Sequence, residues 1–158
     1  MTILTVYYSR TGITKKAAEE IAQALNCPIE RLEGVKSRLG IWGYIMAGRE
    51  AMLKKCPEIK EVKFDPSNFD LIVIGSPNWA GYMASPLRSY LIQTRGKIKK
   101  AAIFITQGGG GAEKVIKDIE NLINKPSVAQ LMLRAREIMS GSSNEKIISF
   151  SSQIKSLK

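Results

Sequence analysis

Apolar residues follow two different spacings along the chain, and the two spacings alternate. Largely apolar runs rich in β-branched residues predict buried strands over 3–8, 71–74 and 101–106. Two further strands, whose apolar residues are interrupted by polar ones, are expected over 29–32 and 129–135. Apolar residues at helical spacing predict helices over 13–25, 86–91, 115–123 and 144–157. Strands that alternate with helices in this way form a parallel sheet covered on both faces.

The order of these elements predicts an α/β fold, a three-layer doubly wound sheet of five parallel strands. One domain over 1–158 is expected, because 158 residues can bury a single core and the chain has no repeat, linker or low-complexity tract. Ligands of such sheets bind beyond the carboxyl ends of the strands, at the switch point of the topology. The turns after the first, third and fourth strands therefore form the candidate site.

The stretch 36–55 departs from this alternation. Its large apolar residues suggest helical faces, whereas Gly40, Gly43 and Gly48 weaken any single long helix. We expect a broken or bent helical segment there, which Pro57 ends. The residues that suggest the helical faces are Leu39, Trp42, Ile45, Met46, Met52 and Leu53.

The composition excludes several kinds of protein. The chain has no histidine, which rules out His-dependent triads and imidazole zinc sites formed by this chain alone. Its two cysteines, Cys27 and Cys56, are too far apart for a CxxC pair and too few for a disulfide framework, so reduced thiols are expected. No stretch approaches the roughly 20 apolar residues of a membrane helix, and the N-terminus is typical of a strand, which favours a cytoplasmic protein.

The charge balance is strongly basic. The chain has 24 Lys and Arg against 14 Asp and Glu, a net charge of +10, and a sequence pI near 9.7. Such a field attracts nucleic acid, an anionic membrane surface, a phosphorylated ligand or an acidic redox protein. The basic residues are scattered and lack the aromatic interleaving of single-strand binders, so a nucleic-acid-binding module is the least favoured interpretation.

The first candidate turn consists of Ser9, Arg10, Thr11, Gly12, Ile13 and Thr14. Backbone amides at a helix N-terminus point outward unpaired, the hydroxyl groups can donate, and Gly12 lets the backbone approach a ligand closely. Capping of the helix is the simpler alternative, but three hydroxyl groups and a glycine exceed what a cap needs. We therefore expect a phosphate site, although the turn is neither a Walker loop nor a GxGxxG fingerprint.

The other two turns carry the groups that a flat ring needs. Residues 76–82 place Trp79 among small residues just beyond a strand, where an aromatic side chain can stack on a planar ring. Residues 106–111 include four successive glycines, whose uncovered backbone can lie edge-on against a heterocycle. Packing of Trp79 and flexibility of the glycines are the alternatives. Together the turns predict a ligand with a phosphate at one end and a flat ring at the other.

These three motifs resemble those of the flavodoxin family. Tyr7 to Thr14, YYSRTGIT, is similar to the family's FMN phosphate loop, Ser/Thr-x-Thr-Gly-x-Thr. Gly75 to Gly81, GSPNWAG, resembles the loop that places an aromatic residue and a backbone carbonyl beside the isoalloxazine ring. Gln107 to Gly110, QGGG, resembles the second flavin-side loop. The motifs follow one another in the family's order over nearly the whole chain.

The resemblance implies the flavodoxin-like strand order 2-1-3-4-5 and FMN as the cofactor. The residues that it implies for the phosphate are Ser9, Arg10, Thr11, Gly12, Ile13 and Thr14, with Arg10 and Ile13 contributing main-chain amides. Those implied for the flavin are Pro77, Asn78, Trp79, Ala80 and Gly81 around the ring, and Gln107, Gly108, Gly109 and Gly110 at its pyrimidine edge. In flavodoxins a peptide after the third strand reorients on flavin reduction, and Ala80–Gly81 is the matching position here.

The resemblance also implies electron transfer through the bound flavin to a redox partner protein, with no catalytic side chain and no metal. An FMN-dependent NAD(P)H oxidoreductase acting on quinones or similar acceptors is the alternative, since the same fold serves both roles. Most flavodoxin electron carriers are acidic, so the basic charge here makes an acidic partner a candidate. Residues 38–55 resemble a segment of a little-characterised flavodoxin-like subgroup. Core packing is expected for Trp42 and Tyr44, and cover for the flavin's outer face is the alternative.

Overall fold

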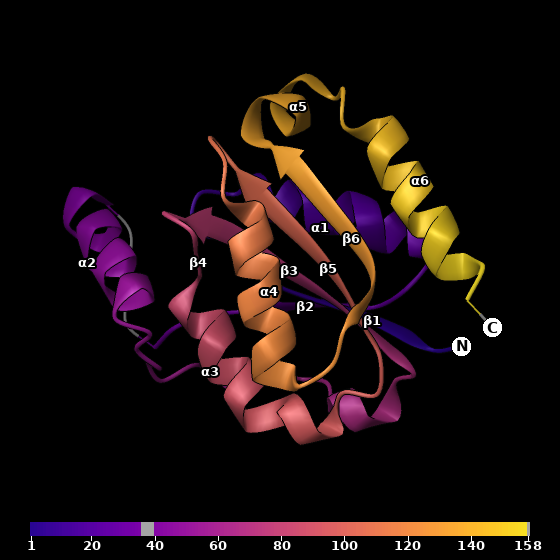
Figure 1. Ribbon diagram of the computed structural model, residues 1–158, viewed down its shortest axis with the longest axis horizontal. Helices are drawn as coiled ribbons and strands as arrows, with labels where there is room; N and C mark the ends of the chain where they lie inside the picture. The colour runs from indigo at the N-terminus through magenta and orange to yellow at the C-terminus, as the bar shows by residue number, and fades with distance from the viewer. Residues whose placement is uncertain (36–39, 158) are drawn as a thin grey trace.

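Five parallel strands form the centre of the molecule, in the spatial order β2-β1-β3-β5-β6 (Figure 1). They are β1 (Ile3–Tyr8), β2 (Ile29–Leu32), β3 (Leu71–Trp79), β5 (Ala101–Gln107) and β6 (Ser127–Arg134). A two-residue strand, β4 (Tyr82–Met83), pairs antiparallel with the end of β3. Counted over the parallel strands alone, this is the predicted order 2-1-3-4-5. The computed structural model, which describes residues 1–35 and 40–157, thus confirms the predicted α/β fold.

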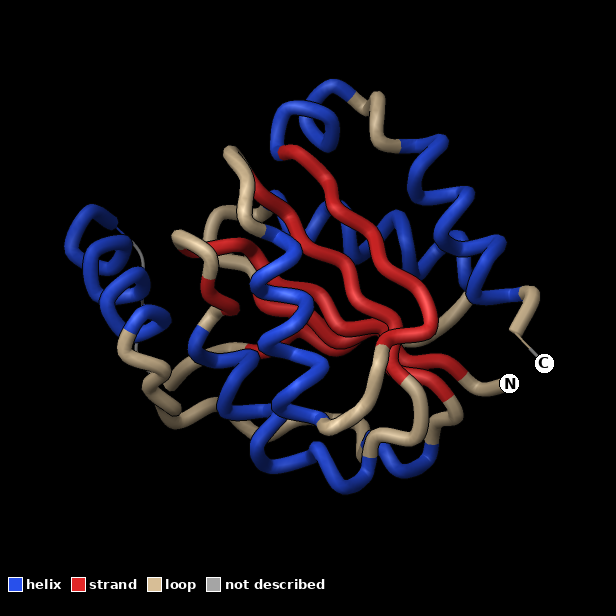
Figure 2. The backbone as a smooth tube through the Cα atoms, viewed as in Figure 1, coloured by secondary structure: helices blue, strands red, loops and turns tan. Residues whose placement is uncertain are grey.

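Helices cover both faces of the sheet (Figure 2). On one face, α1 (Ile13–Leu25), α5 (Ala135–Ser140) and α6 (Asn144–Lys155) pack on a core that includes Leu71 and Phe104. On the other face, α3 (Ser85–Thr94) and α4 (Ala112–Ile123) pack on a core that includes Ile72 and Ile103. Neighbouring strand residues thus point to opposite cores, as the pleat of a strand requires. Short 3₁₀ turns at Pro66–Asn68 and Arg95–Lys97 lie in the connections.

Helix α1 has the bounds that its sequence predicts. Its apolar side includes Ala17, Ala18 and Ile21, which are completely buried against the sheet. The helix ends because Asn26 adopts the left-handed conformation, where its backbone N–H donates to the last carbonyls of the helix. The position of α1 fixes the turn in front of it at the carboxyl end of β1.

Packing explains why residue 75, the first of the GSPNWAG motif, is a glycine. A Cβ at Gly75 would lie 2.1 Å from Cζ of Phe104, so the phenylalanine ring occupies the space that any side chain there would need. The prediction that the strand stops at residues 75–77 is wrong. These residues pair in register with residues 104–106 of β5, and pairing of the next two residues with β4 extends β3 to Trp79.

The last strand and its connection also differ from the prediction. Strand β6 begins at Ser127 rather than Ala129 and ends at Arg134, and the unpredicted helix α5 follows directly from Ala135. The backbone N–H of Arg134 donates to Glu137 Oε2 at 2.8 Å, which caps the start of α5. A short helix with a single buried residue has too little apolar periodicity to be recognised from sequence.

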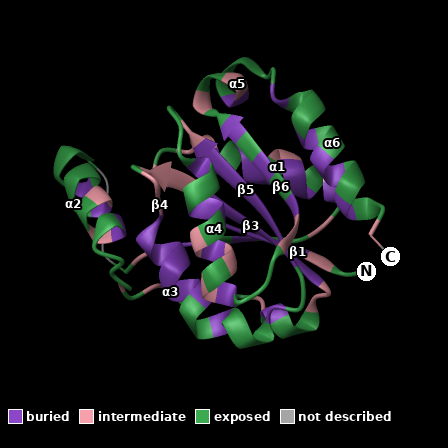
Figure 3. Ribbon diagram, viewed as in Figure 1, coloured by how far each residue is buried: buried purple, intermediate pink, exposed green. Residues whose placement is uncertain are grey.

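The middle segment forms α2 (Gly40–Met52), which lies at the edge of the molecule beside α3 and the β3–β4 hairpin (Figure 1). The predicted break does not occur within these bounds, and the helix ends at Met52, before Pro57. Residues 36–39, Leu39 among them, lie outside the described part. Core packing of Trp42 and Tyr44 is also wrong, because the two residues are 79% and 61% exposed. Much of α2 is exposed (Figure 3).

Trp42 and Tyr44 are exposed because α2 packs against the protein through its smallest residues. Gly43, Ala47 and Ala51 recur at every fourth position and are the buried residues of the helix. A stripe without long side chains lets the helix approach its neighbours closely. Glycines that weaken a helix in isolation therefore make the packing face of this one.

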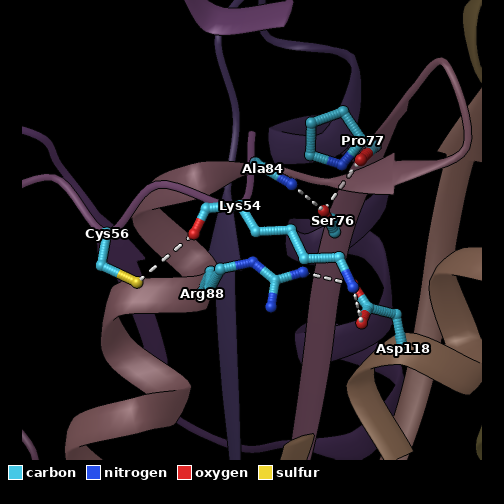
Figure 4. A network of polar contacts seen from close by, with 7 residues as sticks. All are labelled: Lys54, Cys56, Ser76, Pro77, Ala84, Arg88 and Asp118. Atoms are coloured by element: carbon cyan, nitrogen blue, oxygen red, sulfur yellow. Dashed lines mark hydrogen bonds and ion pairs between the residues drawn. The ribbon is translucent and has the colours of Figure 1, made fainter. Parts of the chain in front are cut away.

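A polar network ties α3 to α4 and to the segment after α2 (Figure 4). The buried Arg88 of α3 forms an ion pair with Asp118 of α4, and Lys54 Nζ lies 3.8 Å from the same carboxylate. In the same region Ser76 Oγ accepts a hydrogen bond from the backbone N–H of Ala84 at 3.1 Å. These contacts hold the base of the β3–β4 hairpin in place.

Both cysteines are free thiols, as the sequence predicts. Cys27 is half-buried with Sγ 3.3 Å from Oγ1 of Thr5, and burial raises the pKa of this thiol. A raised thiol pKa lowers the reactive thiolate fraction, so Cys27 is a packing residue. Across residues 1–35 and 40–157, every helix is too short or too polar to cross a membrane.

Candidate functional site

The first turn leaves backbone amides open at the start of α1. Gly12 is the N-cap, with φ +98°, and no side chain caps the helix. The first hydrogen bond inside the helix runs from the N–H of Lys16 to the carbonyl of Gly12, at 3.0 Å. The amides of the first turn therefore have no partner within the helix and stand at the positive end of its dipole. Capping by Ser or Thr, the simpler alternative, does not occur.

Two of the three hydroxyl residues of this turn, Ser9 and Thr14, are buried. Ser9 is 4% exposed, and its Oγ accepts a hydrogen bond from the N–H of Gly12 at 3.1 Å, which leaves the hydroxyl proton available for a ligand. Oγ1 of Thr14 lies 2.7 Å from Oγ1 of Thr106 at the end of β5. In that pair one hydroxyl donates to the other, and the second keeps a proton to donate. This contact brings the first and third turns together.

The remaining residues of the first turn point in different directions. Thr11 is exposed. The side chain of Ile13 packs against the core on the α1 side of the sheet, so only its backbone faces a ligand. The guanidinium of Arg10 lies 4.8 Å from the ring centre of Tyr44, a cation–π contact that joins the first turn to α2.

The second turn is a tight hairpin. Ala80 and Gly81 both have positive φ, +53° and +86°, which defines a two-residue type I′ turn between β3 and β4. Oδ1 of Asn78 accepts a hydrogen bond from the N–H of Gly81 at 2.7 Å, and Nδ2 donates to the carbonyl of Gly110 at 2.9 Å and to Oε1 of Gln107 at 3.3 Å. One side chain thus shapes the hairpin and joins it to the third turn.

The third turn presents bare backbone. Gly108, Gly109 and Gly110 are exposed, and a Cβ at any of them would meet no atom within 4 Å. Gly111 has φ +96° and begins α4. The open edge of these three peptides can lie against a flat ligand, as predicted.

Trp79 is partly packed and partly open to a cavity. Its ring meets that of Tyr8 edge-on, with centroids 5.6 Å apart, and its buried part packs against the core under α3 and α4. The rest of the side chain lines a cavity. Pro77, by contrast, is a strand residue that pairs in register with Thr106.

This cavity, of about 370 Å³, lies between α2 and the hairpin. Its size is that of an ordinary small-ligand site. The hairpin supplies Asn78, Trp79 and Ala80, and the helix supplies Tyr44, Ile45, Gly48, Arg49 and Met52. The α2 residues other than Tyr44 were not predicted, because their contribution depends on where α2 docks. Thr106 was also missed as a partner of Thr14, although a threonine that ends an apolar strand was the available signal.

The three predicted turns therefore meet at one edge of the sheet. The start of α1 offers amide and hydroxyl donors for an anion, and the α2 groove and the glycine turn offer apolar walls and bare peptide edges for a flat ring. The Thr14–Thr106 and Asn78–Gly110 contacts hold these parts together.

The fold is flavodoxin-like. Flavodoxin 2 from Bacillus cereus superposes with a TM-score of 0.61 at 16% identity, covering 98% of each chain. The two-electron reduced flavodoxin of Megasphaera elsdenii superposes with a TM-score of 0.61 at 15% identity, covering 97% of this chain and 99% of that one. These two likenesses concern the fold.

A more similar protein is the flavoprotein from Lactobacillus acidophilus NCFM, whose crystal structure was solved in complex with FMN. It superposes with a TM-score of 0.72 at 26% identity, covering 89% of this chain and 98% of that one. No family model matches the sequence, and no curated protein matches it either.

Proposed function

We propose that the protein binds FMN at this edge of the sheet and transfers electrons through the bound flavin. The observation that carries the proposal is the uncapped start of α1, where open amides lie beside the buried hydroxyl groups of Ser9 and Thr14. A dianionic phosphate matches these donors in charge and geometry. The FMN complex of the similar Lactobacillus acidophilus flavoprotein supports the same ligand.

Each part of the site has a role in this proposal. Ser9, Thr11, Gly12 and Thr14 hold the phosphate together with the amides of Arg10 and Ile13; Pro77 to Gly81 contact the ring; and Gln107 to Gly110 contact its pyrimidine edge. FMN supplies the redox chemistry when it is bound. The protein orients the ring, excludes water from part of it, and sets the hydrogen bonds that its nitrogen and oxygen atoms meet.

The hairpin between β3 and β4 restrains the Ala80–Gly81 peptide. The N–H of Gly81 is held by Asn78, so a reorientation of the Ala80–Gly81 peptide has to break that hydrogen bond. Ala80 already has a positive φ, which costs a residue with a Cβ about 1 kcal/mol. The peptide at the expected flavin edge is therefore both strained and tethered, and Asn78 decides how readily it turns.

A titration of the apoprotein with FMN and with riboflavin, followed by flavin fluorescence, tests the phosphate site. We expect tight FMN binding and much weaker riboflavin binding. Ser9→Ala removes one donor to the phosphate and should weaken FMN about tenfold while leaving riboflavin unchanged. Ser140→Ala, a serine beyond β6, is the matched control. Equal affinities for FMN and riboflavin would contradict the proposal.

A second candidate, an FMN-dependent NAD(P)H oxidoreductase, is favoured by one observation. A pocket of about 300 Å³ on the other side of the hairpin is lined by Lys54, Lys114 and Lys117 together with Gly81 and Tyr82. Its acidic residue, Asp118, already pairs with Arg88 and Lys54. The pocket thus keeps a positive charge that suits the phosphates of a nicotinamide nucleotide.

Anaerobic mixing of the FMN-loaded protein with NADPH separates the two candidates. If the protein is a reductase, NADPH bleaches the bound flavin directly. The double variant Lys114→Gln/Lys117→Gln should then slow this bleaching about tenfold at low NADPH concentration. Lys125→Gln with Lys155→Gln is the charge-matched control. If the protein is a carrier, NADPH leaves the flavin oxidised.

The proposal of an FMN-binding electron carrier also includes a cytoplasmic location, one domain over 1–158 and an acidic redox partner.

A further inference from the structure

The side of α2 that faces away from the protein is apolar. Six large apolar residues, five on α2 and one directly after it, are more than half exposed, and we call them together the α2 outer face: Ile41, Trp42, Ile45, Met46, Met52 and Leu53. A surface helix ordinarily turns its polar side to water. A continuous exposed apolar surface on a helix marks a place where something binds.

The chemistry of this face is that of a lipid contact rather than a protein contact. The indole N–H of Trp42 is the single hydrogen-bonding group among its six side chains. Protein interfaces carry about one hydrogen bond per 100–200 Å², so a protein partner would find few groups to pair with. A second copy of the chain is disfavoured by charge, because two molecules of net charge +10 repel each other.

Cationic side chains lie at one end of the face. Arg49 is on the last turn of α2, and Lys55 lies three residues beyond the end of the helix; both are exposed. Long basic side chains at the edge of an apolar surface can reach lipid phosphates while their stems stay in the apolar layer. The net charge of +10 attracts the whole molecule to an anionic surface.

We propose that the α2 outer face binds the surface of membranes that contain anionic lipids, with α2 lying flat in the interface. Trp42 and Met46 enter the apolar layer, and Arg49 and Lys55 meet the headgroup phosphates. Ile45 and Met52 belong both to this face and to the cavity between α2 and the hairpin. If the cavity holds the flavin ring, as the proposed function has it, the ring would sit at the membrane surface.

Flotation of the full chain with lipid vesicles tests this directly. The probes are vesicles of phosphatidylcholine alone and of phosphatidylcholine mixed with phosphatidylglycerol. We expect binding to the mixed vesicles, weakening as salt is raised, and a blue shift of tryptophan emission that Trp42→Phe abolishes. Binding is measured without added FMN, so its failure leaves the cofactor proposal untouched.

The decisive variant is the triple change Ile41→Gln, Trp42→Gln and Met46→Gln, at positions outside the cavity. It should lower vesicle binding on the order of tenfold or more. The matched control changes three exposed apolar residues elsewhere, Ile92→Gln, Met139→Gln and Ile148→Gln, and should bind as the wild type does. Wild-type protein that does not float, or a triple variant that floats as well as the control, overturns the proposal. The proposal is also overturned if the wild-type protein sediments as a dimer and the triple variant as a monomer.

Discussion

Helices α1 and α2 are each 13 residues long, yet they place their large apolar side chains on opposite sides. In α1 these side chains face the sheet, and Ile21 is completely buried. In α2 only Gly43, Ala47 and Ala51 are buried, and Ile41 on the outside is 79% exposed. Apolar spacing therefore predicts that a helix forms, whereas the side it turns inward depends on the shape of its neighbours.

The two helices also differ in what their packing does for the molecule. The packing of α1 holds the sheet together and fixes the turn at residues 9–12. The packing of α2 leaves a cavity beside the hairpin and an apolar surface outside. We infer that the packed side of α1 stabilises the sheet and positions the phosphate site at the start of the helix, whereas α2 contributes mainly surfaces for binding.

The largest expected effect is on core packing. Ile21→Ala should lower the free energy of unfolding by about 3 kcal/mol, because it opens a cavity in a fully buried position. Ile41→Ala, the same change on α2, should alter it by no more than about 0.5 kcal/mol. Chemical denaturation measures both. An Ile41→Ala variant destabilised as much as Ile21→Ala would mean that the α2 outer face is covered.

The next effect concerns the small-residue side of α2. Ala47→Leu places a long side chain where Ala47 is 1% exposed and should cost about 2 kcal/mol of unfolding free energy. Met46→Leu, one position along and 51% exposed, is the control and should be neutral. Equal stability of the two variants in denaturation would show that α2 does not pack through Gly43, Ala47 and Ala51.

The glycines that precede or begin the two helices give a matched pair. Gly12 and Gly40 have φ of +98° and +80°, with open space where a Cβ would lie. Gly12→Ala and Gly40→Ala should each cost about 1 kcal/mol through backbone strain. Only Gly12→Ala should also weaken FMN binding, about tenfold, because the strain disturbs the amides at the phosphate site. A similar loss of FMN affinity in Gly40→Ala would place the phosphate elsewhere.

The smallest effect lies on the polar outer side of α1. Nζ of Lys15 and Oε1 of Glu19 are 3.7 Å apart in an exposed pair one turn apart. Glu19→Gln should cost about 0.3 kcal/mol at low salt and nothing measurable at high salt, as shown by paired denaturation curves. A larger cost would mean that the outer side of α1 has a structural role beyond that of a solvated surface.

Features that depend on the local sequence could be predicted, whereas features that depend on contacts between distant segments could not. The bounds of α1 and the positions of the turns follow from residues that act where they stand, such as Gly12 before α1 and the apolar run of β1. The strand order did not follow from such local signals and came from the resemblance to the flavodoxin family. The continuation of β3 to Trp79 could not be predicted, since it depends on pairing with β5 up to Pro77 and with β4 beyond it. The walls of the cavity were missed for the same reason: Gly48 and Met52 become part of it only because α2 docks beside the hairpin.

The most direct test of the proposed site is an NMR map of backbone amide shifts as FMN is added to isotope-labelled protein. The account predicts the largest shifts at Thr11, Ile13 and Thr14, with further shifts in the hairpin from Asn78 to Gly81, in the glycine turn from Gln107 to Gly110, and at Gly48 on α2. Shifts centred on the lysine pocket at Lys114 and Lys117, with the start of α1 unchanged, would contradict it.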